Sequence, residues 1–256
     1  MNRLKVLMIL FLVGMIATGG VLAYYVAGYY KDRKDSESIK EIAYGTVQKT
    51  SGEEAGDLPD GQVETLDDSV VIDFGSLKSV NGDTVGWLRA CDGDIDGPVV
   101  QTTDNSFYLD HRFDKTSGSV GCFFADAQLD KAFDGPITVV YGHNRKDGSM
   151  FHPLLYYKDE KYFLDHPTFT VYTESGEYTY RVFSAYFADN DVVYDKTFAG
   201  AATDGDQSAL EALFDKALER SLYKASEAVS PDDIVILSTC EYSGDNNRMV
   251  VYGVRE

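Results

Sequence analysis

The sequence predicts a mostly β fold, a closed barrel or a sandwich with peripheral helices, preceded by one N-terminal transmembrane helix. Seven or so short runs of β-branched and aromatic residues, bounded by Gly, Asp, Asn and Pro, are typical of such folds. An uncharged stretch near the start is long enough to cross a bilayer. With 256 residues, 44% of them hydrophobic, the chain can bury one sizeable core, so we expect one globular domain.

The uncharged stretch runs from Val6 to Tyr30. As a helix it would be about 37 Å long, and it exceeds the apolar core of about 7 to 15 residues in a cleaved signal peptide. We therefore predict an uncleaved signal anchor in residues 1–30. Arg3 and Lys5 before the stretch are matched by basic residues after it, so the flanking charge does not fix the orientation.

The composition of residues 31–66 predicts a stalk or linker. Residues 31–66 are first charged and helix-compatible, then rich in Gly, Asp, Glu and Ser, a composition typical of loosely ordered linkers. From Val70 onward short apolar runs begin, with the turn signal Asn81-Gly82-Asp83 among them. We therefore expect the folded domain to span residues 67–256.

Strands and helices follow from the local patterns. Two helices are expected: Met150 to Tyr157 with Ser149 as N-cap, and an amphipathic helix with an apolar stripe from Leu210 to Leu222. The runs that read as strands are Pro98 to Gln101, Ser119 to Ala125, Ile137 to Tyr141, Thr168 to Tyr172, Tyr178 to Ala188, Ile234 to Thr239 and Arg248 to Val254.

The charge balance excludes one class of partner. Asp and Glu number 42 against 23 Lys and Arg, a formal net charge of -19. Phosphate contacts need clustered basic side chains, so we expect no nucleic-acid partner.

The three cysteines are Cys91, Cys122 and Cys240, and the odd number leaves at least one free thiol. Cys122 lies in an apolar run and is expected to be a buried, inert thiol. A disulfide between Cys91 and Cys122 is possible, although the spacing alone does not support it. The histidines have no metal-ligand spacing with a carboxylate or a second Cys, so we expect no zinc site and no cofactor.

Three reactive side chains stand at the ends of predicted strands. Cys240 follows the run from Ile234, His143 follows the run from Ile137, and Arg248 opens the last strand. A thiol at the edge of a rigid strand is held by the sheet and stays open to a substrate. The three residues are therefore expected to converge on one side of a barrel.

The three reactive side chains lie in the segments Tyr141-Gly142-His143-Asn144, Leu237-Ser238-Thr239-Cys240-Glu241 and Asn247-Arg248-Met249-Val250-Val251. Together these segments closely resemble the sortase signature, in the same chain order and near the same separations. The resemblance covers about 190 residues, from roughly Asp67 to the end. Three further features are similar to those of class B sortases. They are a short motif after His143, a strand with aromatic residues, and a long helix before the strand that carries Cys240. The motif after His143 is Gly148-Ser149-Met150-Phe151, and the aromatic strand contains Phe183-Ser184-Ala185-Tyr186.

The resemblance implies an eight-stranded β-barrel enzyme of Gram-positive cell surfaces, a membrane protein with one span and an extracellular catalytic domain. Such enzymes cut a C-terminal sorting signal of a secreted protein after a Thr and join the Thr to an amine of a peptidoglycan precursor. Cys240 would be the nucleophile, His143 the acid and then the base, and Arg248 the oxyanion stabiliser. By position, the residues expected to bind substrate are Ser238, Tyr141, Val100, Tyr194 and Glu241.

Two alternatives remain at this point. A surface cysteine peptidase would use the same Cys-His pair but release the acyl group to water. A non-catalytic anchored β-domain that binds a surface partner would leave His143 and Cys240 far apart.

Overall fold

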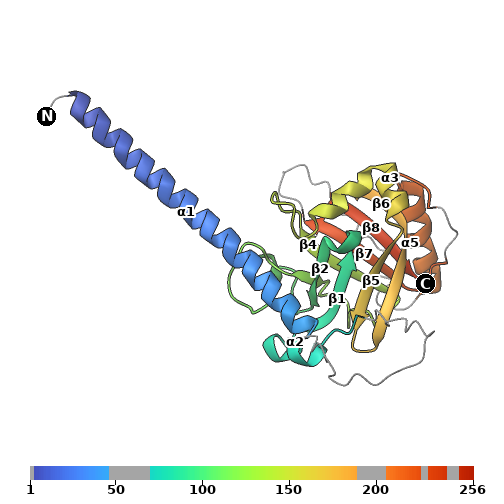
Figure 1. The fold of residues 1–256 in the computed structure, drawn as a ribbon. Coiled ribbons are helices and arrows are strands. Elements are labelled where there is room, and N and C mark those ends of the chain that lie inside the picture. Colours follow the sequence, from blue (N-terminus) through green and yellow to red (C-terminus); the bar gives the residue numbers. More distant parts are fainter. Residues whose placement is uncertain (1–2, 46–69, 189–205, 226–229, 241–247) are drawn as a thin grey trace, which may run out of the picture. The chain divides into compact units, whose positions relative to one another are not determined.

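A computed structural model describes residues 3–45, 70–188, 206–225, 230–240 and 248–256 (Figure 1). The chain divides into two compact units, Met1–Glu41 and Ile42–Glu256. The first unit belongs to helix α1 (Arg3–Ala43). Its apolar part, from Phe11 on, has a mean hydropathy of 1.7, and by length and composition it can cross a membrane. Within the described ranges, α1 alone has this property.

The second unit is built on a closed barrel in the order β1-β2-β3-β4-β7-β8-β6-β5, which confirms the predicted fold class (Figure 1). Neighbouring strands are antiparallel except for β2 with β3 and β4 with β7, which run parallel. The strands are β1 (Thr84–Ala90), β2 (Ile95–Val100), β3 (Phe123–Ala125), β4 (Ile137–His143), β5 (Thr168–Thr173), β6 (Gly176–Ala188), β7 (Ile234–Cys240) and β8 (Arg248–Arg255).

All seven predicted strands correspond to observed ones, and two differences have local causes. Strand β1 was not predicted, because Gly86 and Arg89 interrupt its apolar pattern; Gly86 lies beside a register shift, where an added Cβ would come within 2.8 Å of the Phe133 ring. Strand β3 is shorter than predicted, because Gly121 has a φ of +66° and turns the chain just before it.

Strand β4 is buried along its whole length, as are the described side chains of β7 from Ile234 to Thr239. Continuous apolar runs are what a parallel pair inside a protein requires, since both faces are covered. The inward residues of all eight strands form one hydrophobic cluster, in which Leu88, Val140, Leu237 and Val251 are each fully buried. This core fixes the register of the strands that end at the candidate site.

The helices confirm one prediction and correct another. Helix α5 (Gln207–Arg220) buries Leu210, Leu213 and Phe214, and the Phe214 ring packs 4.6 Å from that of Phe183 on β6. The helix predicted for Met150 to Tyr157 is present but begins later: the chain forms the 3-10 helix η3 (His152–Lys158), with Phe151 and not Ser149 before it.

The physical reason for this correction is the conformation of Met150, whose φ of 59° is incompatible with a right-handed helix. The described part of this unit also contains the short α-helices α2 (Phe74–Val80) and α3 (Glu160–Asp165).

The second unit includes Ala43 and Tyr44, which precede the predicted domain in the sequence. The Ala43 side chain is fully buried, and its carbonyl accepts a hydrogen bond from the Asp73 N–H at 2.7 Å. The Tyr44 hydroxyl donates to Asp96 Oδ1 at 2.5 Å, and its ring meets Trp87 edge to face. Residues 46–69 lie outside the described ranges, so the predicted linker and the boundary at 67 stay predictions.

Truncation of Leu88 tests the core. Leu88→Ala removes a fully buried side chain from the barrel, and we expect a loss of about 2–5 kcal/mol in the free energy of unfolding. The matched control is Leu164→Ala on α3, where the side chain is 48% exposed and the expected loss is about 1 kcal/mol or less. Urea unfolding measures both, and equal losses would contradict the assignment of the core.

Candidate active site

His143, Cys240 and Arg248 stand at the ends of three neighbouring strands. In the parallel pair β4 and β7, His143 is the partner of Cys240. In the antiparallel pair β7 and β8, the last residues in register are Ser238 and Val250; β7 ends two residues later at Cys240, and β8 begins two residues earlier at Arg248. The N–H of Met249 donates to Thr239 Oγ1 at 3.0 Å and holds the two strands together at this end.

The strand directions explain this alignment. Parallel strands β4 and β7 end at the same edge of the barrel, and the antiparallel strand β8 begins there. Residues in register on neighbouring strands share a face, with backbones about 5 Å apart. Positions 143, 240 and 248 therefore form a row across one face at one end of the barrel.

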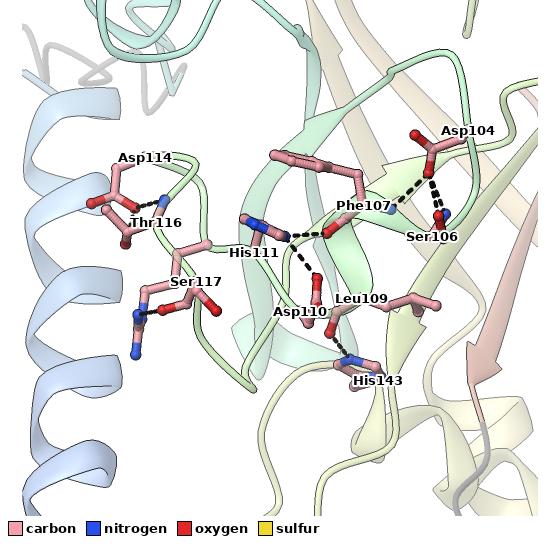
Figure 2. Close-up of polar contacts among 11 residues, drawn as sticks. Asp104, Ser106, Phe107, Leu109, Asp110, His111, Asp114, Thr116, Ser117 and His143 are labelled. Carbon is pink, nitrogen blue, oxygen red and sulfur yellow. Dashed lines mark hydrogen bonds and ion pairs between the residues drawn. The ribbon is translucent and has the colours of Figure 1, made fainter.

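His143 is the most closely held member of the row. Its side chain is 5% exposed, and Nε2 lies 2.6 Å from the Leu109 carbonyl oxygen (Figure 2). A carbonyl only accepts, so Nε2 carries the hydrogen in the neutral ring. Burial lowers the pKa of His143; the Leu109 carbonyl raises it and the nearby charge of Arg145 lowers it, and the net pKa is below 6.5. The neutral imidazole therefore predominates at neutral pH.

Glycines give the imidazole and its strand their space. A Cβ on Gly121 would come within 2.6 Å of the Tyr108 carbonyl oxygen and 3.1 Å of His143 Cδ2. A Cβ on Gly142 would come within 2.8 Å of the stacked rings of Phe123 and Phe151. Neither position accepts a larger side chain without displacing groups that pack beside His143.

The substrate-binding predictions fall into three groups. Ser238 and Tyr141 are in register with each other, two residues before Cys240 and His143, so they share the face of the row. The Ser238 hydroxyl is buried and finds no hydrogen-bond partner within the described ranges. Val100 is fully buried on β2. Tyr194 and Glu241 lie outside the described residues.

Tyr141 is part of a buried polar network beside the row. Its hydroxyl donates to Asp126 Oδ2 at 2.8 Å, and Asp126 Oδ1 accepts from Asn105 Nδ2 at 3.2 Å. Both Asp126 and Tyr141 are almost fully buried, so these bonds offset the loss of water around the carboxyl group. The network ties β4 to the loop between β2 and β3.

The other two cysteines are separate from the row. Cys91 and Cys122 are both free and buried, and burial raises the pKa of each thiol to about 12. The expectation of a buried thiol at Cys122 is confirmed, and thiols with such a pKa stay protonated and unreactive at neutral pH.

Two features of the site were missed from the sequence. The contact between Leu109 and His143 joins residues 34 positions apart through a backbone carbonyl, which no side-chain pattern reveals. Gly121 did carry a signal, because a lone Gly inside a strand-like run often marks a close backbone approach.

Comparison with known proteins identifies the fold and the enzyme class. Residues 92–256 match the family model "Sortase domain". The chain is 36% identical to Sortase B of Listeria monocytogenes over 180 residues, which cover 69% of this chain and 71% of the relative.

Solved structures agree with this match. Sortase B of Bacillus anthracis in complex with AAEK1 has a TM-score of 0.70 at 29% identity and covers 90% of this chain and 98% of that one. A Staphylococcus aureus sortase B-substrate complex has a TM-score of 0.64 at 27% identity, with 72% of this chain and 84% of that one covered. The chain thus belongs to the sortase family of cysteine transpeptidases, as a class B member.

Proposed function

We propose that this transpeptidase cleaves a C-terminal sorting signal after a Thr and transfers the Thr carbonyl to an amine of a peptidoglycan precursor, using Cys240, His143 and Arg248. The observation that supports the assignment most directly is the β4–β7 register, in which His143 and Cys240 are partners, together with the start of the neighbouring strand β8 at Arg248. A non-catalytic domain with His143 and Cys240 far apart is not compatible with this register.

In the first half-reaction, the thiolate of Cys240 attacks the Thr carbonyl carbon and forms a tetrahedral oxyanion. The guanidinium of Arg248 stabilises that charge, because it is a cation whose planar fork can hold two oxygens. The C–N bond then breaks, and His143 gives a proton to the departing amine. A thioester on Cys240 remains.

In the second half-reaction, the precursor amine attacks the thioester carbonyl. His143, now neutral, takes a proton from that amine, and the C–S bond breaks to regenerate the thiolate. The lowered pKa of His143 favours the neutral form that this step needs. The proton donor of the first step is protonated His143, which is the minor form at neutral pH and becomes more abundant as the pH falls.

The substrate groove is proposed to involve Ser238, Tyr141, Val100, Tyr194 and Glu241. Ser238 has the clearest physical support, because a buried hydroxyl without a partner costs about 1–3 kcal/mol and a substrate amide would supply one. Tyr141 and Val100 would act from behind the groove, since both are almost fully buried.

The product distribution tests the proposed reaction. We expect peptides of the Asn-Pro-x-Thr or Leu-Pro-x-Thr type to form a covalent acyl-enzyme on Cys240, and an added oligoglycine or diamino acid to increase the transfer product at the expense of hydrolysis. Mass spectrometry measures both. Cys240→Ala should form neither product while it keeps the wild-type unfolding midpoint.

The matched control is Cys91→Ala, which removes a buried thiol elsewhere and should keep turnover. A product ratio that does not respond to any added amine would favour the cysteine peptidase instead.

The oxyanion role of Arg248 has its own test. Arg248→Ala should lower kcat by about 10²–10³-fold, the usual effect of removing one oxyanion donor, and Arg248→Lys should recover only part of the loss. The matched control is Arg255→Ala at the other end of β8, where the guanidinium stacks over Tyr178. Loss of kcat in Arg255→Ala alone, with Arg248→Ala active, would refute the role.

The lowered pKa of His143 predicts a pH effect on stability. The folded pKa lies below the 6.5 of the unfolded chain, so between those two values the unfolded chain binds more protons. The contribution of His143 is full above about pH 6.5 and is lost as the pH falls through the folded pKa. Urea midpoints from about pH 7.5 to about pH 5 should therefore fall more in the wild type than in His143→Gln. Equal falls would contradict the lowered pKa.

In this proposal, residues 1–30 anchor the enzyme in the cell membrane as a single span, with the N-terminus in the cytoplasm and the catalytic domain outside. The length and hydropathy of α1 support an anchor. We expect the full chain to sediment with membranes until detergent is added, and a chain without residues 1–30 to stay in the supernatant. A full chain that is soluble without detergent would argue against anchoring.

A further inference from the structure

The loop between β2 and β3 contains a short turn that is held by one carboxylate. Oδ1 of Asp104 accepts hydrogen bonds from the Ser106 N–H at 2.7 Å, the Ser106 hydroxyl at 2.6 Å and the Phe107 N–H at 2.7 Å (Figure 2). These bonds lower the pKa of Asp104, so the carboxylate stays ionised. They fix the start of the 3-10 helix η2 (Phe107–Leu109).

Side-chain contacts of Phe107 and Tyr108 also hold the η2 turn in place. The His111 ring stacks on Phe107 with centroids 4.0 Å apart, and its Nδ1 lies 2.9 Å from the Phe107 carbonyl oxygen. Tyr108 is buried, and its hydroxyl accepts from Asn81 Nδ2 at 2.8 Å and donates to Asp83 Oδ2 at 2.7 Å. The turn therefore has little freedom while its first residues keep their bonds to Asp104.

The last residue of the turn is the one that meets His143. The Leu109 carbonyl lies 2.6 Å from His143 Nε2, and Figure 2 shows it directed at the imidazole. This bond makes Nε2 the protonated nitrogen of the neutral ring and leaves the lone pair on Nδ1. Proton transfer needs one tautomer and one ring orientation, so the position of this carbonyl matters for the chemistry.

We propose that Asp104 is a positioning residue, which holds the η2 turn so that the Leu109 carbonyl keeps His143 in the Nε2–H tautomer and in the orientation for proton transfer. The inference rests on the proposed role of His143 and adds a residue that is exposed and has no described contact with the imidazole. The effect is transmitted through Phe107, Tyr108 and the Leu109 carbonyl.

The same loop offers a matched control. Oδ1 of Asp114 accepts from the Thr116 N–H at 3.0 Å and the Thr116 hydroxyl at 2.6 Å, so it holds a turn of the same kind (Figure 2). Like Asp104 it is exposed, but its turn does not include Leu109. Asp114→Ala thus removes a comparable cap without moving the carbonyl on His143.

The experiment compares Asp104→Ala, Asp104→Asn and Asp114→Ala in the full chain in detergent. Loss of a cap of this kind should lower kcat about 3- to 30-fold in Asp104→Ala, with KM within about twofold of the wild type. Asp104→Asn keeps an oxygen that can accept the same bonds and should restore most of kcat. Asp114→Ala should keep the wild-type kcat.

The second readout is the imidazole itself. In ¹H–¹⁵N spectra of the side chain, His143 of the wild type, Asp104→Asn and Asp114→Ala should show a protonated Nε2, and Asp104→Ala should show a mixture of tautomers or a shifted signal. The proposal is overturned if Asp104→Ala keeps both kcat and the His143 signal, if Asp114→Ala loses as much activity, or if activity falls with an unchanged His143 signal.

His143→Gln separates this inference from the proposed function. If that variant keeps full activity, the assigned role of His143 fails, while a shifted His143 signal in Asp104→Ala would still establish that Asp104 positions the ring. If His143→Gln is inactive and the signal does not respond to Asp104→Ala, the role of His143 stands and the positioning role of Asp104 fails.

Discussion

The parallel pairing of β4 with β7 is the constraint on which the site depends. Their register runs unbroken from Ile137 with Ile234 to His143 with Cys240, and every described side chain along it is buried. A slip of one residue would turn the apolar side chains of one strand to the opposite face. The burial of apolar side chains that stabilises this strand pair therefore also keeps His143 beside Cys240 at the strand ends. Strand β8 begins with Arg248 at the same edge.

His143 shows how the fold tunes a side chain beyond placing it. Its strand fixes the Cα position, but the loop between β2 and β3 determines its surroundings through the Leu109 carbonyl and the absence of a Cβ at Gly121. Burial favours the neutral ring, and the carbonyl selects which nitrogen carries the hydrogen. Two separate parts of the barrel thus cooperate at one residue.

The sequence could predict most of the barrel strands, because runs of β-branched and aromatic residues between turn residues indicate which segments are buried in a sheet. It also indicated that Cys240, His143 and Arg248 stand at strand ends, yet only the strand order and register show that the three ends are neighbours. The turn at Gly121, the left-handed Met150 and the interrupted pattern of β1 depend on tertiary packing that overrides local preference. The contact of Leu109 with His143 could not be predicted from side-chain patterns, because a backbone oxygen makes it.

The proposed mechanism requires a sulfur, an imidazole and a guanidinium to act on one carbonyl at this end of the barrel. A crystal structure of the enzyme trapped through Cys240 on a sorting-signal peptide analogue tests it most directly. We expect the trapped carbonyl oxygen to lie about 3 Å from the guanidinium of Arg248, with the His143 ring on the side of the departing amine. A guanidinium turned to another face of the barrel, with the carbonyl oxygen bound elsewhere, would contradict it.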